Sequence, residues 1–395
     1  MSKPFDKRAP HRLRRALRTW RSRFPRRARR SGRSSNNRVR LLHDGHEALP
    51  AMLAAIASAR EEVLLEMYWF GSDRTGRRFA TALIERARAG VVVRVTYDAI
   101  GSLEAGDAMF DEMRAAGVEV HEFNPIAPWR ARFRFARINQ RDHRKLLVVD
   151  GWRAITGGFN LGDPWAPKEE GGQGWRDDGI EIVGSAAVEL RHLFYRTFPG
   201  RPSLLSQPRT AEGHVDVTVL ASDLHAERRD IYDGYINAIA RATRDIIITN
   251  SYFIPSFRVR RALARAVARS VRVRVLMPRD TDVKLAQLAS RHLYKRLLRD
   301  GVELYEWAGG ILHSKTAAID EDWCTVGSFN FDARSIQNNL ELNVAVVSHE
   351  VNAALRERVE VDLAQSVKIE LASWKKRSLF IRLVEWTVYQ FRWLL

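Results

Sequence analysis

The sequence predicts an α/β fold made of two similar halves, each with a mostly parallel mixed sheet flanked by helices. Three observations predict it. Strand-like and helix-like segments alternate in the first half. The same order of segments returns after Pro199-Gly200-Arg201-Pro202, a stretch typical of a linker. A short polar motif also stands late in each half, at matching positions.

The alternation begins at Val39 and stays regular as far as Glu122. Short apolar runs rich in β-branched residues predict strands at residues 39–42, 63–70, 91–96 and 118–122. Apolar residues at helical spacing predict helices between these strands, at residues 47–59, 77–89 and 107–116. Strands that are separated by helices of this length lie parallel in one sheet.

Two pairs of segments show that the second half repeats the first. Residues 59–65 correspond to residues 242–248, and residues 117–120 correspond to residues 301–304. These pairs are offset by 183 and 184 residues, whereas the histidines of the polar motif are only 170 residues apart. The first half therefore carries about 14 extra residues before its motif, which indicates a duplication with one insertion.

The polar motif has the same spacing in both copies. A His-x-Lys pair is followed by an Asp seven residues after the His, a Gly seven residues after that Asp, and an Asn three residues further on. The copies consist of His143, Lys145, Asp150, Gly157 and Asn160, and of His313, Lys315, Asp320, Gly327 and Asn330. Because residue types and spacings agree independently, the repetition indicates a shared role.

Each motif is expected to form a β-hairpin. Leu146–Val149 reads as a buried strand, Asp150-Gly151 as a tight turn, and residues 153–156 as the returning strand. Side chains alternate along a strand, so the His and the Lys of a motif share one face. The residues after each hairpin are expected to bind a substrate phosphate through backbone N–H groups and amides, at Gly158, Asn160, Ser328 and Asn330.

Two copies brought together would surround one point with two imidazoles, two ammonium groups and two amides. This set suits a phosphodiester, because cations and amides neutralise the non-bridging oxygens in the transition state. One histidine can attack phosphorus while the other protonates the leaving oxygen and later acts as general base. The alternative is two solvated basic strands with incidental histidines, which a single copy would fit better than two.

The paired motifs resemble the HKD signatures of the phospholipase D superfamily, over about residues 38–366, and the nearest form is the bacterial cardiolipin synthases. The resemblance implies two similar α/β lobes, with the active site at their pseudo-twofold interface. It also implies a two-step reaction through a phosphohistidine, without a metal or other cofactor, and favours His143 as the nucleophile. The catalytic residues it implies are His143, Lys145, Asp150, His313, Lys315 and Asp320.

In this superfamily an acidic residue after each motif holds its histidine. The matching positions are Asp177 and Glu341, although the adjacent Asp178 could replace Asp177. A carboxylate would fix the tautomer of each imidazole and keep it basic beside the lysines. The resemblance then divides the chain into an arm (1–37), two lobes (38–200 and 201–370) and a tail (371–395).

The charge is concentrated at the beginning of the chain. Of the net charge of +18, residues 1–40 hold +15, and the remainder holds only +3. Leu13, Leu17, Trp20 and Phe24 recur at helical spacing, so part of this arm, otherwise expected to be disordered, could form a basic amphipathic helix on an anionic membrane. A transit peptide and a nucleic-acid-binding arm are alternatives. No secretory signal is expected, and the single cysteine, Cys324, cannot form an intrachain disulfide.

Two further segments suggest lipid. The insertion at residues 125–141 mixes Trp129, Phe133 and Phe135 with arginines and leads into His143, so it could form a rim that inserts among lipid tails. Packing of these aromatic residues on the second lobe is the alternative. The tail at residues 371–395 reads as an amphipathic helix in the membrane interface, or as a helix packed on the protein itself.

These patterns favour a phosphatidyltransferase that makes cardiolipin from phosphatidylglycerol and a second phospholipid. A hydrolytic phospholipase D, and a nuclease or phosphodiesterase of the same superfamily, are alternatives. The expected partners are phospholipids and an anionic membrane, with nucleic acid less favoured and the oligomeric state not predicted. The expected location is peripheral, on the cytoplasmic face of the bacterial inner membrane.

Overall fold

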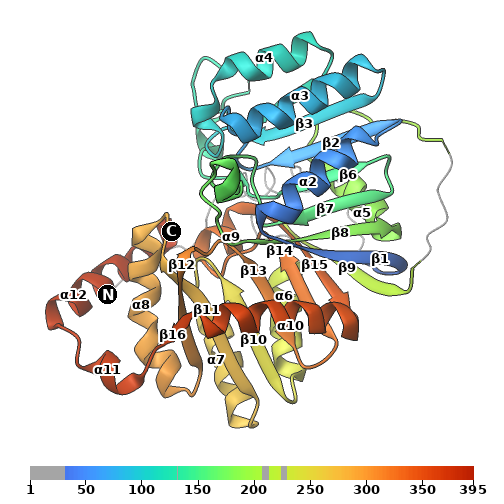
Figure 1. Cartoon of the computed structure of the whole chain (residues 1–395). Coiled ribbons are helices and arrows are strands. Elements are labelled where there is room, and N and C mark those ends of the chain that lie inside the picture. The colour runs from blue at the N-terminus through green and yellow to red at the C-terminus, as the bar shows by residue number, and fades with distance from the viewer. Residues whose placement is uncertain (1–31, 131, 207–212, 224–228) are drawn as a thin grey trace, which may run out of the picture. The chain divides into compact units, whose positions relative to one another are not determined.

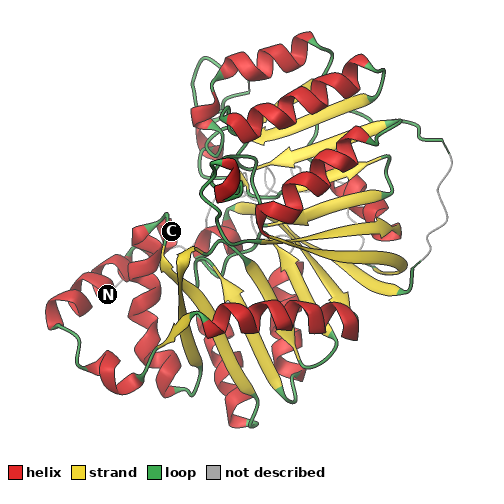
Figure 2. Cartoon of the chain, in the orientation of Figure 1, coloured by secondary structure: helices red, strands yellow, loops and turns green. Residues whose placement is uncertain are grey.

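One mixed sheet runs through both halves of the chain, and helices cover its faces (Figures 1 and 2). The computed structural model describes residues 32–130, 132–206, 213–223 and 229–395. Residues 33–395 form one compact unit. Most of the predicted basic arm, with Leu13, Leu17, Trp20 and Phe24, lies outside the described residues.

The first half alternates strands and helices as expected. Its strands are β1 (Arg33–His43), β2 (Glu62–Met67), β3 (Val92–Asp98), β4 (Glu119–Phe123), β5 (Arg141–Asp142), β6 (Leu146–Val149), β7 (Arg153–Gly157) and β8 (Asp178–Gly184). Its helices are α2 (Asp44–Ala57), α3 (Arg74–Arg88), α4 (Asp107–Ala115) and α5 (Ser185–Phe194), with short 3₁₀ turns at Leu103–Ala105, Phe135–Arg137 and Lys168–Glu170.

The second half repeats this order without the insertion. Its strands are β9 (Val215–Ser222), β10 (Asp245–Asn250), β11 (Arg272–Asp280), β12 (Glu303–Ile311), β13 (Lys315–Ile319), β14 (Trp323–Gly327) and β15 (Asn339–Val347). Its helices are α6 (Asp230–Arg241), α7 (Phe257–Ala268), α8 (Lys284–Arg299), α9 (Ala333–Gln337) and α10 (His349–Ala364). The chain continues with β16 (Ser366–Lys368), α11 (Leu371–Lys375), α12 (Leu379–Gln390) and a 3₁₀ turn, η5 (Arg392–Leu394).

The strand order shows the duplication directly. It is β16-β12-β11-β10-β13-β14-β15-β9-β1-β8-β7-β6-β2-β3-β4, so equivalent strands appear in mirrored order on either side of the β9–β1 contact. The two-lobe α/β layout is therefore confirmed. The sheets are mixed, however, because only β2–β3 and β3–β4 are parallel among the six pairs formed by the described strands of the first half.

The expectation of a mostly parallel sheet was wrong because the motif hairpin adds antiparallel strands. β6 pairs antiparallel with β2, and β7 returns antiparallel to β6. The domain boundary also needs correction. β1 begins at Arg33 and pairs with β9, so residues 33–37 belong to the sheet and not to the arm.

The central part of the core is shared between the halves. One hydrophobic cluster contains Leu190 of α5 and Leu355 of α10, together with Val148 of β6 and Val344 of β15. Figure 1 shows α10 crossing the strands of the second half. Burial of apolar residues from both halves in one cluster resists separation of the halves, since it removes their surface from water together.

The aspartates of the two motifs close hairpin turns. Asp150 and Asp320 have φ angles of 48° and 49°, in the left-handed region that a short polar side chain tolerates. The Asp150 carboxylate accepts hydrogen bonds from the backbone N–H groups of residues 60–62, and Asp320 accepts them from residues 243–245. Each carboxylate thus ties the hairpin to the turn before the neighbouring strand.

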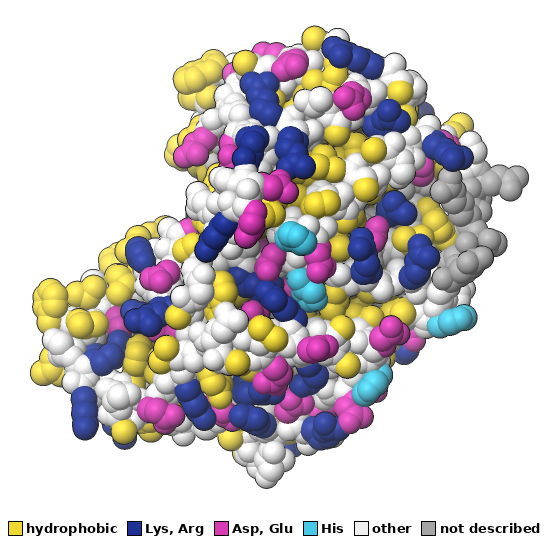
Figure 3. Space-filling model, viewed as in Figure 1, with side chains coloured by type: hydrophobic (Ala, Val, Ile, Leu, Met, Phe, Trp, Pro, Cys, Tyr) yellow, Lys and Arg dark blue, Asp and Glu magenta, His cyan; other side chains and the backbone are white. Residues whose placement is uncertain are grey.

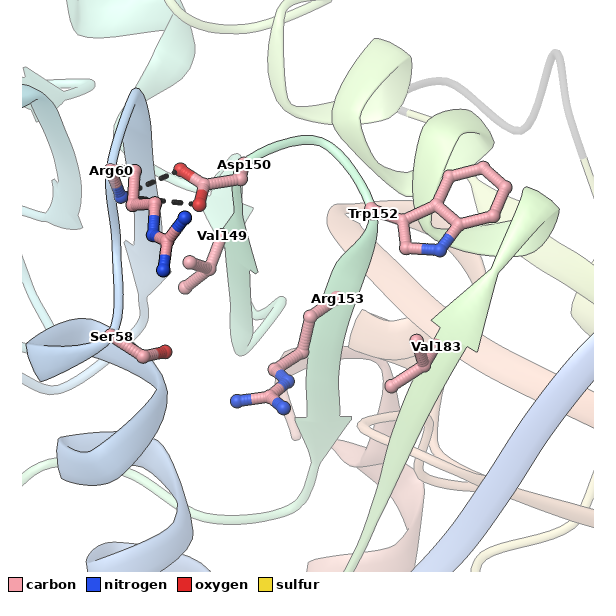
Figure 4. Close-up of a pocket in the computed structure, with 7 residues that line it drawn as sticks. All are labelled: Ser58, Arg60, Val149, Asp150, Trp152, Arg153 and Val183. Atoms are coloured by element: carbon pink, nitrogen blue, oxygen red, sulfur yellow. Dashed lines mark hydrogen bonds between the residues drawn. The ribbon is translucent and has the colours of Figure 1, made fainter. Parts of the chain in front are cut away.

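Asp150 lies at the opposite end of β6 from Lys145, about 16 Å away for five residues of extended chain. Its carboxylate borders a cavity of about 460 Å³, which Figure 4 shows with Asp150 bonded to the backbone of Arg60. Neither histidine lines that cavity. The assignment of Asp150 and Asp320 to the catalytic residues is therefore corrected, because their position and contacts are structural.

We expect Asp150→Ala and Asp320→Ala each to lower the midpoint of thermal unfolding by several degrees, because each leaves backbone N–H groups without an acceptor, at a cost of ~1–3 kcal/mol. Circular dichroism melts measure this change. Asp322→Ala is the matched control, since its carboxylate is 67% exposed. Equal melting points for all three variants would contradict the structural role.

Candidate active site

The two histidines are held by backbone hydrogen bonds that cross between the halves. The N–H of His143 donates to the carbonyl of Leu340 at 2.9 Å, and the N–H of His313 donates to the carbonyl of Arg176 at 2.7 Å. The short strand β5, directly before His143, also pairs in parallel with the start of β15. Each histidine therefore lies against the opposite half of the chain.

The side chains repeat this crossed arrangement. His143 Nδ1 lies 3.1 Å from Glu341 Oε2, and His313 Nδ1 lies 2.7 Å from Asp177 Oδ2. Both predicted carboxylates therefore hold a histidine. Each of them holds the histidine of the other motif, however, and not the one that precedes it in sequence, so the pairing stated in the sequence analysis is corrected.

The choice between Asp177 and Asp178 is also settled. Asp178 accepts a hydrogen bond from Ser314 Oγ at 2.6 Å and contacts Arg176 and His43. The nearby guanidinium of Arg176 holds the pKa of Asp178 far below its ordinary value against the effect of burial. By contrast, burial raises the pKa of Asp177 to about 6. Asp177 therefore orients the histidine, while Asp178 anchors the surrounding backbone.

Both motif lysines are buried beside the histidines. The ammonium of Lys145 donates to the carbonyl of His143 at 2.7 Å, and Lys315 bonds the carbonyl of His313 and Ser251 Oγ. Burial lowers the pKa of Lys145 to about 7 and that of Lys315 to about 8. Across the site, the charge of Lys315 also lowers the pKa of Lys145, and the charge of Lys145 lowers the pKa of His313. The two motifs thus share one electrostatic environment.

The histidines are buried and packed on aromatic rings. Desolvation lowers the pKa of His143 and of His313 below the ordinary value, which favours the neutral imidazole. The ring of Tyr68 lies edge-on to His143 at 4.9 Å, and that of Trp165 lies edge-on to His313 at 5.3 Å. With Nδ1 bonded to a carboxylate, each ring presents Nε2 as the available nitrogen.

The predicted phosphate-binding residues divide into two groups. The N–H groups of Gly158 and Ser328 are bonded to the carbonyls of Asp178 and Leu342, so they are not available to a phosphate. A Cβ at Gly158 would lie 2.0 Å from Asp177 Oδ1, and Ser328 Oγ donates to Glu341 at 2.5 Å. Both residues therefore support the carboxylates, which corrects their assignment to phosphate binding.

The two predicted asparagines are both buried and have different contacts. Asn160 Oδ1 accepts a hydrogen bond from the N–H of Trp69 at 3.1 Å, which leaves its NH₂ group for a ligand. Asn330 is buried, and no described residue bonds its Oδ1. The NH₂ groups of Asn160 and Asn330 are the donors that suit a phosphate oxygen, whereas the free Oδ1 of Asn330 is itself an acceptor.

Sequence reasoning missed residues that hold the carboxylates and their surroundings in place. Ser335 Oγ of α9 donates to Glu341 Oε1 at 2.7 Å, and Asp332 caps α9 through the N–H of Ser335. Arg176 pairs with Asp362 of α10 at 2.9 Å, which is a buried ion pair between the halves. Ser335 stands at the end of the run Gly-Ser-Phe-Asn-Phe-Asp-Ala-Arg-Ser that follows the second hairpin, but no spacing rule indicates that it bonds Glu341.

The insertion before His143 has both exposed and buried side chains. Trp129 is 84% exposed and Phe135 is 81% exposed, so these rings do not pack on the second lobe. Arg141 is buried, and its guanidinium bonds Asp98 and the carbonyls of residues 124 and 137, so it does not belong to an exposed basic rim. Within the described residues, no helix has the length and hydropathy to cross a bilayer.

Comparisons with known proteins give one family. A family model described as "Cardiolipin synthase, PLD-like domain" matches residues 52–167 and 235–363. A probable cardiolipin synthase of Bacillus subtilis is 30% identical over 361 residues, or 89% of this chain and 71% of that protein. Cardiolipin synthase B of Salmonella typhimurium is 30% identical over 83% of this chain and 81% of its own length.

A solved structure shares the fold. The crystal structure of phosphatidylserine synthase from Haemophilus influenzae has a TM-score of 0.70 with this chain, at 12% sequence identity. The similarity covers 90% of this chain and 95% of that chain. It therefore extends across both halves and the sheet that joins them.

The crossed pairing can be tested by NMR titration of the histidine rings. We expect Glu341→Gln to lower the pKa of His143 further, because the carboxylate stabilises its protonated form, and to leave the pKa of His313 unchanged. Asp177→Asn is the matched variant, with the main effect expected on His313. A shift of His313 in Glu341→Gln would instead indicate pairing within each motif.

Proposed function

The chain belongs to the cardiolipin synthase family with the PLD-like domain, and on this premise we propose that it is a phosphatidyltransferase that makes cardiolipin from phosphatidylglycerol and a second phospholipid. One observation carries the proposal. Two buried imidazoles, each held at Nδ1 by a carboxylate, lie within one cluster of cations. That arrangement serves a two-step displacement at phosphorus.

In the first step, Nε2 of the nucleophilic histidine attacks the phosphorus of the donor phospholipid. The bond from phosphorus to the leaving headgroup oxygen breaks, and the second histidine, which the negatively charged phosphodiester favours in its protonated form, gives its proton to that oxygen. A phosphatidyl-histidine remains. We assign His143 as the nucleophile and His313 as the acid, as the family resemblance implies, with Glu341 and Asp177 stabilising the positive charge on each ring.

In the second step, a hydroxyl of phosphatidylglycerol gives its proton to His313 and attacks the same phosphorus. The bond between phosphorus and nitrogen breaks, which frees His143 and releases cardiolipin. The ammonium groups of Lys145 and Lys315 and the amides of Asn160 and Asn330 neutralise the non-bridging oxygens in both transition states. A bound phosphodiester also raises the pKa of the lysines toward the ordinary value, because its negative charge stabilises ammonium groups that burial disfavours.

Transfer wins over hydrolysis when water is excluded while the lipid hydroxyl is held in place. Burial of both histidines and both lysines supports such exclusion. Protein on a lipid surface would also meet phosphatidylglycerol at high local concentration. We propose a peripheral location on the cytoplasmic face of the bacterial inner membrane, supported by the basic composition of residues 1–40 and by the exposed rings of Trp129 and Phe135.

We expect His143→Ala and His313→Ala each to abolish cardiolipin synthesis from phosphatidylglycerol vesicles while the melting temperature changes little. Lipid extraction and chromatography would resolve cardiolipin from phosphatidic acid, and a parallel assay would use DNA. His192→Ala, on α5 and away from the site, is the control. Phosphatidic acid as the sole product would indicate a hydrolase, and cleavage of DNA alone a nuclease. Full activity in either site variant would contradict a shared site.

We expect kcat/KM to fall as the pH rises through about 7 to 8, because Lys145 and Lys315 lose their protons there and with them the charge that attracts the phosphodiester. Lys145→Arg should move this decline to higher pH, since arginine stays protonated. Initial rates across the pH range measure it, with the exposed Lys284→Arg as control. An unchanged alkaline decline in Lys145→Arg would remove Lys145 from this role.

A further inference from the structure

Helix α12 presents its apolar side outward. Six large apolar side chains of α12 and the residues that follow are at least half exposed, and we call them the tail face: Leu379, Phe380, Leu383, Trp386, Phe391 and Trp393. Figure 3 shows hydrophobic side chains gathered over this part of the chain. The charged Glu385 of the same helix is buried. A helix on a water-exposed surface normally has the reverse arrangement.

The orientation of α12 is fixed by contacts with other residues of the same chain. Glu385 forms a two-point ion pair with Arg377, with oxygen–nitrogen distances of 2.5 and 2.9 Å. Tyr389 stacks on His292 of α8 at 4.6 Å, and Trp374 stacks on Tyr294 of the same helix at 4.9 Å. The helix therefore packs on its own lobe, as the alternative in the sequence analysis stated, and still leaves the tail face uncovered by described residues.

Cations gather beside the tail face. Lys295 and Arg299 lie one turn apart on α8, and the charges of Arg299, of Arg382 on α12 and of Lys375 on α11 each lower the pKa of the partly exposed Lys295 by repulsion. Dark-blue side chains lie next to the hydrophobic group in Figure 3. An apolar helix face with a cationic rim is complementary to a membrane surface that carries anionic headgroups over acyl chains.

We propose that the tail face docks on an anionic lipid bilayer and so places the active site at the membrane surface. The proposal deepens the proposed function, because it identifies the surface that meets the lipid substrate. An apolar patch without charge could equally fit a protein partner. The four-cation rim is what favours anionic lipid.

The tail is also connected to the catalytic residues. The carbonyl of Leu395, directly after η5, accepts a hydrogen bond from the N–H of Arg334 in α9 at 3.2 Å. Ser335 of α9 bonds Glu341, and Glu341 holds His143. Figure 1 places residue 395 beside α9. The end of the tail is therefore in direct contact with the segment that supports the carboxylate of Glu341.

The test compares the full-length protein with the double variant Leu383→Glu/Trp386→Glu, in flotation with vesicles of phosphatidylglycerol and phosphatidylcholine. The expected result is at least a tenfold weaker partition of the variant, because two exposed apolar groups that would enter the bilayer become negatively charged and face anionic headgroups. Measurement at about 1 M salt, where screening acts beyond ~3 Å, removes most of the contribution of the basic arm and of the cationic rim, so that the remaining difference reports the apolar residues.

The control is Val347→Glu/Val361→Glu, which adds the same charges at apolar positions that are 39% and 45% exposed on β15 and α10. It should bind vesicles like the unaltered protein. The tail variant should keep its turnover of short-chain phosphatidylglycerol below the concentration at which this lipid forms micelles, and lose turnover on vesicles.

Equal vesicle binding by both double variants would overturn the proposal. So would a dimer of the unaltered protein that the tail variant dissociates in sedimentation without any change in vesicle binding, because a second copy would then cover the tail face. Loss of vesicle binding in a protein that makes no cardiolipin would support docking and reject the proposed function, so the two failures are distinguishable.

Discussion

The structure depends on a pair of hydrogen bonds that each histidine makes to the opposite half of the chain. The backbone N–H of His143 bonds Leu340, and its ring bonds the next residue, Glu341; His313 is held in the same way by Arg176 and Asp177. Two contacts to consecutive residues fix both the position and the rotation of an imidazole. Because each half supplies a histidine to one pair and a carboxylate to the other, neither half can orient a histidine alone. The two halves thus form the histidine–carboxylate pairs only in contact with each other, and the hydrophobic cluster that α5 and α10 share holds them in contact.

The same arrangement concentrates charge that folding alone would not favour. Two lysines, two histidines and two carboxylates are buried around one point, and burial lowers the pKa of Lys145 from 10.5 to about 7. This shift opposes folding fully below about pH 7, where the ammonium is charged even in the folded state, and the penalty disappears as the pH rises toward 10.5. A phosphodiester would supply the missing negative charge. The site is therefore preorganised for a ligand that has the opposite charge, with the stability supplied by the surrounding sheet.

Local patterns in the sequence were sufficient to predict much of the fold and many residues of the candidate site. Apolar periodicity gave the strands and helices of the first half, and the spacing of the repeats located the insertion between β4 and β5. The histidines, lysines and carboxylates predicted from the motifs also contact one another in the structure. Partners that are distant in sequence were not, because periodicity carries no information about them. The crossed pairing of Glu341 with His143 spans 198 residues, and the β1–β9 contact joins the halves through residues that composition assigned to a disordered arm. Asp150 was placed with the catalytic groups because spacing alone does not distinguish a turn-capping aspartate from one in the site.

Some features of the molecule are repeated in both halves, and others occur in one half only. Strand order, hairpins and the histidine–carboxylate pairs obey the pseudo-twofold relation, and the proposed reaction, in which both imidazoles reach one phosphorus atom, accounts for it. The departures are the insertion in the first half and the segment after β16 in the second. Both expose apolar side chains: Trp129 and Phe135 in the insertion, and the tail face in the other. Chemistry at phosphorus imposes symmetry on the interior, whereas a flat lipid surface touches only one side of the molecule. Additions that serve that surface, as we propose for the tail face, need to occur in one half only, which accounts for their asymmetry.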